Sequence, residues 1–70
     1  MPELPIEQDN ITLAQALKAT GLADSGGHAK HLIREGRATV NGGVEKHPGR
    51  KLIPGDRFQL GDRPEWIVRK

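Results

Sequence analysis

Cysteine is absent from this 70-residue chain, and aromatic residues are almost absent. Without cysteine, the chain has no disulfide framework and no cysteine-based zinc site. The two aromatic residues, Phe58 and Trp66, lie in apolar stretches typical of strands, which predicts that both belong to the core. Proteins that stack unpaired RNA bases need exposed aromatic side chains, so base stacking is not expected here.

Long hydrophobic runs are also missing, and the longest aliphatic stretches are pairs such as Leu32-Ile33. No segment is long enough to span a membrane. The start, Met1-Pro2-Glu3-Leu4-Pro5, lacks the basic residues and apolar block of a signal peptide. We therefore expect a cytoplasmic protein with no membrane partner. A chain this short has a small core with no room for an internal ligand pocket, so function is expected on the surface.

Positive charge is concentrated in the middle of the chain, although the formal net charge is only +2. Residues 1–17 carry three acids and no base, whereas residues 18–51 carry seven Lys or Arg against three acids. A basic segment behind an acidic start suggests a polyanionic partner. Taken alone, this feature fits a solvated basic surface equally well.

Two helices are predicted from their end signals. Thr12 followed by Gln15 is a capping-box pattern that begins a helix, and Gly21 is a natural end for it. Asp24-Ser25 supplies an N-cap for a second helix, and Gly36 its C-terminal stop. Two short helices joined by a few residues should form a hairpin or a crossed pair.

Strand patterns dominate after the second helix. Asn41-Gly42 is a strong hairpin signal and should have positive φ at both residues. Strands are expected near residues 4–6, 38–40, 43–45, 52–53, 58–60 and 65–68. The predicted fold class is therefore α+β, with two short N-terminal helices packed on a small, mostly antiparallel sheet. Residues 1–70 are expected to form a single domain.

The segment Ser25-Gly26-Gly27 at the start of the second helix is unusual, because each glycine costs about 1 kcal/mol relative to alanine within a helix. Bare glycines expose backbone N–H groups that would suit a phosphate. Close packing against the first helix and a helix that begins later are the two alternatives. The three possibilities stay open at the level of sequence, and Ser25, Gly26 and Gly27 are candidate phosphate contacts.

Two basic clusters follow, one on the second helix and one on a loop. Lys30, Arg34 and Arg37 have the i, i+4, i+7 spacing of one helix face. A Pro-Gly turn carries the second cluster. The candidate RNA-binding side chains are Lys30, His31, Arg34, Arg37, Lys46, His47, Arg50 and Lys51. The alternative interpretations are an ordinary solvated helix face and a solubilising turn.

Catalytic and metal-binding patterns are weak. Ser25 and His28 lie three residues apart, but Ser25 is better explained as a helix cap and no third triad member is evident. His28 and His31 lack a carboxylate on the same face to complete a metal site. We expect no enzymatic activity, no metal and no cofactor.

The ordered motifs Ser25-Gly26-Gly27-His28-Ala29-Lys30, Val40-Asn41-Gly42, Gly49-Arg50-Lys51-Leu52 and Gly55-Asp56 resemble one known family. They are similar to the small standalone S4-type RNA-binding proteins of bacteria, the YbcJ/YaaA-like group, over about residues 11–60. The resemblance implies an αL RNA-binding motif, with contacts from Lys30 on the second helix and from Arg50 and Lys51 on the loop. The ribosomal version tends to have Arg where this chain has Gly26 and Gly27, which favours the standalone subgroup.

These observations predict a non-enzymatic module that binds structured RNA through its phosphates. Ribosomal or transfer RNA, free or within ribosomal particles, is the expected partner, and the chain is expected to act as a monomer. One alternative is a protein–protein adaptor whose basic patches are only solvated. A small hydrolase or metal protein is a further alternative, against which the absence of cysteine and of paired carboxylates argues.

Overall fold

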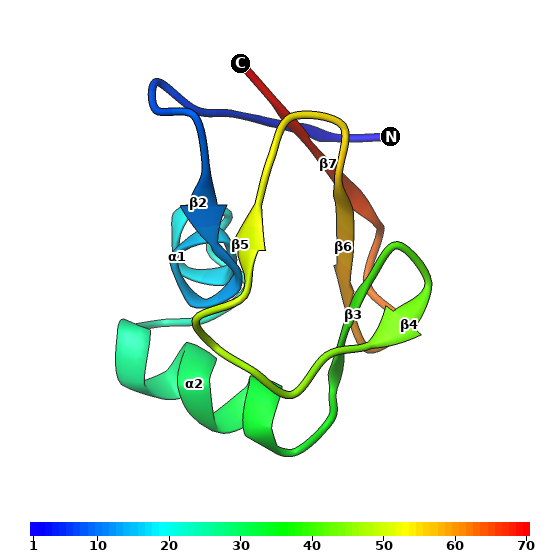
Figure 1. Cartoon of the computed structure of the whole chain (residues 1–70). Helices are drawn as coiled ribbons and strands as arrows, with labels where there is room; N and C mark the ends of the chain where they lie inside the picture. Colours follow the sequence, from blue (N-terminus) through cyan, green and yellow to red (C-terminus); the bar gives the residue numbers. More distant parts are fainter.

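The computed structural model describes residues 1–70 and contains two short helices and seven short strands (Figure 1). The helices are α1 (Leu13–Ala19) and α2 (Gly26–Arg34). The strands are β1 (Glu3–Pro5), β2 (Ile11–Thr12), β3 (Ala38–Val40), β4 (Gly43–Val44), β5 (Lys51–Leu52), β6 (Arg57–Leu60) and β7 (Trp66–Arg69). Neither helix has the length and apolar character that crossing a bilayer would need.

Five strands form the main sheet, in the order β1-β7-β6-β3-β4, and β2 pairs separately with β5. The β1–β7 pair is parallel and every other pair is antiparallel. The prediction of a small, mostly antiparallel sheet beside two helices is therefore confirmed. The prediction that the two helices lie at the N-terminus is not confirmed, because β1 and β2 precede α1. Pairing of Leu4 with Val68, both buried, anchors β1 beside the last strand.

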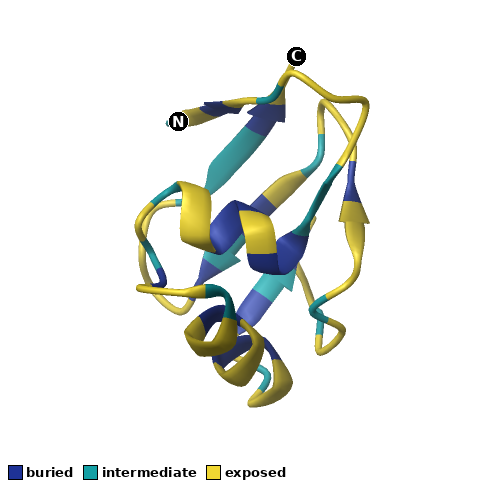
Figure 2. Ribbon diagram, turned by 90° about the vertical axis from the view of Figure 1, so that its left-hand side faces the viewer, coloured by how far each residue is buried: buried dark blue, intermediate teal, exposed yellow.

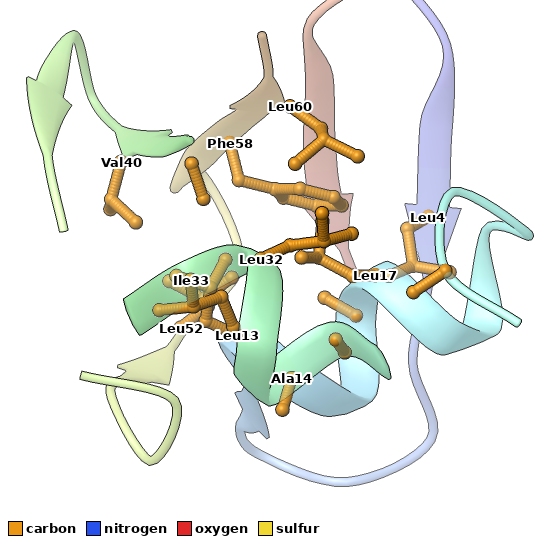
Figure 3. Close-up of a cluster of buried hydrophobic side chains, with 14 of the residues drawn as sticks. Leu4, Leu13, Ala14, Leu17, Leu32, Ile33, Val40, Leu52, Phe58 and Leu60 are labelled. Atoms are coloured by element: carbon orange, nitrogen blue, oxygen red, sulfur yellow. The ribbon is translucent and has the colours of Figure 1, made fainter. Parts of the chain in front are cut away.

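The helices cover one side of the sheet, and the core lies between these two layers (Figure 1). In both helices, buried positions alternate with exposed ones around the axis, as expected for amphipathic surface helices (Figure 2). Figure 3 shows how their aliphatic side chains meet those of the strands around Phe58. The largest fully buried side chains are Phe58, Leu13, Leu17, Ile33, Leu52 and Val68. Trp66 is only partly buried and packs against the edge of this cluster.

The predicted helix ends are confirmed. Thr12 and Gln15 form a complete capping box at the start of α1, and the Ser25 side chain caps α2. The chain leaves α1 and α2 through Gly21 (φ +77°) and Gly36 (φ +79°), and this left-handed conformation strains residues that carry a Cβ.

The predicted hairpin is confirmed as well, since Asn41 has φ +51° and Gly42 has φ +86° between β3 and β4. Asn41 is also bonded to a distant segment. Its Oδ1 accepts from the Arg57 N–H (2.9 Å), and its Nδ2 donates to the Asp56 carboxylate (3.2 Å). These bonds join the hairpin tip to the start of β6 and support the register between β3 and β6.

Candidate nucleic-acid interface

A surface hollow of about 380 Å³ lies between the two helices and the loop that precedes β5. The residues that line it are Thr12, Ala14, Gln15 and Lys18 beside α1, Gly26 and Lys30 on α2, and Pro48 and Gly49 on the loop. Ala14 is the one buried residue among those that line it, so this hollow belongs to the exterior, where function was expected.

The loop at residues 46–50 is fixed to the start of α1 by backbone hydrogen bonds. The N–H of Leu13 donates to the carbonyl of Arg50 (2.8 Å), and the N–H of Ala14 donates to the carbonyl of Pro48 (3.1 Å). These two N–H groups are among those that a helix leaves without an internal partner at its start. The first turn of α1 therefore holds the loop in place and has no free amide to offer a ligand.

The start of α2 is different, because its first amides are free. The Ser25 hydroxyl accepts from the His28 N–H (3.1 Å), while the N–H groups of Gly26 and Gly27 donate no hydrogen bond within the chain. A Cβ added at Gly26 would meet nothing within 4 Å, so close packing does not explain this glycine. The helix begins at Gly26, which also removes the alternative of a later start.

Two lysines face the hollow from different helices. Lys18 and Lys30 are exposed, and neither forms an ion pair with a carboxylate. Lys30 was predicted from the sequence, but Lys18 was not. Lys18 has no other lysine or arginine near it in the sequence. The signal that could have identified it is its position three residues after Gln15, on the polar face of the first helix.

The remaining predicted cations divide into free and paired groups. Arg34 lies one turn after Lys30 on α2, and Arg34, Lys46 and Lys51 are exposed without a carboxylate partner. Arg37 is not on the helix, because α2 ends at Arg34 and the chain turns at Gly36. The predicted stop at Gly36 therefore leaves Lys30 and Arg34 on the helix and separates Arg37 from them.

Glu35 forms an ion pair with Arg37. Its carboxylate lies 3.8 Å from the Arg37 guanidinium and 3.3 Å from Nε2 of His31. His28 has a different partner, because its Nδ1 accepts the N–H of Asp24 (3.1 Å). Each histidine of α2 therefore has a local partner, and no group of three possible metal ligands forms around them.

Glu45 binds two of the predicted RNA-binding side chains of the loop, those of His47 and Arg50. One carboxylate oxygen lies 2.8 Å from Nδ1 of His47, and the other lies 2.6 Å from the Arg50 guanidinium. The side chain of Glu45 is only 14% exposed, against 45% for Arg50. The hydrogen bond from His47, followed by that from Arg50, lowers the pKa of Glu45 below its usual value. Arg50 and His47 are therefore partly committed to shaping the loop.

The stability of the domain should depend on pH through Glu45. Its pKa is lower in the folded chain than in the unfolded chain, so its contribution is complete above the unfolded pKa and is lost as pH falls through the folded pKa. Thermal melting followed by circular dichroism should show a decline between about pH 5 and pH 3 that is shallower in Glu45→Gln.

Glu7 provides the matched control, because it is exposed and has no ion pair. Glu7→Gln should retain the pH dependence of the parent chain. If Glu45→Gln retains it too, the carboxylate does not hold the loop.

The chain is similar to known proteins over most of its length. The S4 domain family matches residues 4–68. Over 57 residues the chain is 40% identical to the probable ribosome maturation protein RlbA of Bacillus subtilis (strain 168), covering 81% of this chain and 80% of that protein. It is 33% identical over 66 residues to the small ribosomal subunit protein uS4 of Anaeromyxobacter sp. (strain K). That match covers 94% of this chain but 29% of uS4, so the chain spans less than a third of that relative.

Proposed function

Because the chain belongs to the S4 domain family, we propose that it binds structured RNA through backbone phosphates, with ribosomal or transfer RNA as its target. The observation that carries this proposal is the hollow lined by Lys18 and Lys30, two cations without carboxylate partners on neighbouring helices. The names of the relatives, a ribosomal protein and a ribosome maturation protein, support a target within the ribosome.

The geometry suits phosphate contact better than base reading. Lysine ammonium groups act as point charges toward phosphates, and the free amides of Gly26 and Gly27 lie at the positive end of α2. Phe58 is buried and Trp66 is partly buried against the core, so neither aromatic residue stands free on the surface as a platform for stacking bases. Recognition would therefore depend on the position of phosphates in a folded RNA rather than on its base sequence.

The flanking cations extend this surface. Arg34 continues from Lys30 along α2, and Lys51 follows the loop on β5. Arg50 would contribute less than a free cation, because the Glu45 carboxylate offsets its charge, and the His47 ring is also bound to Glu45. We take residues 1–70 as one non-enzymatic domain that acts as a monomer in the cytoplasm, in contact with ribosomal RNA or ribosomal particles.

Binding of the chain to RNA should depend steeply on salt. If Lys18, Lys30, Arg34 and Lys51 each meet a phosphate, the slope of log K against log salt should be roughly −3 to −4, at about 0.7 to 0.9 per contact. Filter binding with total ribosomal RNA and with bulk transfer RNA, between about 50 and 200 mM salt, measures this slope.

The adaptor alternative gives a different result. A protein–protein adaptor with solvated patches would show no measurable RNA binding at the lower salt concentration and therefore no slope. That outcome would reject the proposed function.

A further inference from the structure

We infer that Gln15 contacts an RNA phosphate seated in the hollow, with its side-chain amide nitrogen as the donor. This inference rests on the proposed function and assigns a second role to a residue that already caps α1. Gln15 is exposed and lines the hollow together with Lys18, three residues along the same helix, and with Lys30 across from it on α2.

The capping box fixes which end of the Gln15 amide is free. Oε1 of Gln15 accepts the N–H of Thr12 (3.0 Å), while the Thr12 hydroxyl accepts the N–H of Gln15 (3.1 Å). A backbone N–H can only donate, so the amide oxygen must face Thr12. Nε2 of Gln15, which carries two N–H donors, has no acceptor within the chain.

The polar groups around the hollow are therefore rich in donors. Two ammonium groups, the free N–H of Gly26 and the Nε2 amide of Gln15 are available there, and no carboxylate lines the hollow. A ligand that accepts several hydrogen bonds and carries negative charge satisfies such a set, which is the chemistry of a phosphate group. A cationic or donor-rich ligand would leave these groups unpaired.

The use of glutamine rather than glutamate supports the same inference. Glutamate completes a capping box equally well, and its charge is favourable near the positive end of a helix. The first turn of α1 nevertheless contains no acidic residue. A carboxylate at position 15 would add a negative charge beside Lys18 and oppose a phosphate in the hollow, whereas an amide avoids that repulsion.

The substitution Gln15→Glu separates the two roles. It retains the capping box but replaces the free N–H donor with a negatively charged acceptor. The melting temperature should stay the same or rise slightly. Affinity for total ribosomal RNA should fall roughly tenfold to a hundredfold, because a charge-assisted donor is replaced by a charged acceptor. Gln15→Ala should bind about threefold to tenfold more weakly, through loss of the donor without added charge.

Gln8 supplies the matched controls, since it is exposed in the bend before β2 and does not line the hollow. Gln8→Glu and Gln8→Ala should each change affinity by no more than about twofold, because screening weakens charge effects at a distance. If Gln15→Ala binds as tightly as the parent, or Gln15→Glu loses no more than Gln8→Glu, the inference is wrong while RNA binding stands. If the parent chain shows no salt-dependent binding, the inference and the proposed function both fail.

Discussion

Replacing Lys18 and Lys30 together with alanine is expected to weaken RNA binding roughly a hundredfold, because each charge-assisted contact contributes about 1–2 kcal/mol. Loss of two phosphate contacts should also flatten the slope of log K against log salt by roughly 1.5. Both side chains are exposed and form no ion pair, so the melting temperature should barely change. Filter binding over a salt series measures the affinity and the slope together.

Arg57 and Arg63 form the matched control pair. Both are exposed, neither forms an ion pair, and neither lines the hollow. Replacing them together with alanine removes the same formal charge and should cost far less affinity. Equal losses in the two double variants would mean that RNA is held by diffuse charge attraction, and the hollow would lose its assignment.

Replacing Phe58 with alanine is expected to remove about half of the free energy that stabilises the fold. Phe58 is fully buried on β6, opposite Val40 on β3 and Trp66 on β7. Truncating a buried phenylalanine costs about 3–5 kcal/mol. At roughly 0.05–0.15 kcal/mol per residue, a domain of this length has only about 4–10 kcal/mol of stability. Urea denaturation followed by circular dichroism measures the difference.

Ile53 offers the comparison for this prediction, because it is a large aliphatic residue that is 56% exposed. Ile53→Ala should change the free energy of unfolding by no more than about 0.5 kcal/mol. If the two variants lose similar stability, the core is not centred on Phe58.

Local features of this fold could be predicted because neighbouring residues encode them. The capping box needs only Thr12 and Gln15, and the hairpin needs only Asn41-Gly42 with their tolerance of positive φ. The helix stops at Gly21 and Gly36 depend on the same backbone freedom. Each signal acts over four residues or fewer, so no tertiary information was required.

Strand pairing could not be predicted in the same way. Alternation of apolar residues shows which face of a strand is buried but does not identify its neighbour. Nothing around Leu4 indicates a parallel partner in β7, and nothing in Ile11–Thr12 indicates β5. The position of Lys18 opposite Lys30 is likewise a product of how α1 and α2 pack.

A count of charged residues in the sequence overestimates the positive charge that is free on the 46–50 loop and after the end of α2. Arg50 and Arg37 both count as cations in the sequence, but Glu45 and Glu35 lie within 4 Å of them in the structure. Glu45 precedes Arg50 by five residues, and only the turn between them brings the two side chains together. The assignment of RNA contacts to individual residues stays a prediction, with Lys18 and Gln15 now added to it.

The attachment of the 46–50 loop to α1 has a consequence for how the loop's motion can be observed. The amide hydrogens of Leu13 and Ala14 are held by carbonyls of the loop and not by the helix itself. They can exchange with solvent deuterium only when the loop lifts away, whereas the amide of Gln15 is held by Thr12 whatever the loop does. Exchange rates at these two amides therefore report the free energy of opening the loop under conditions where the loop opens more readily than the whole domain unfolds.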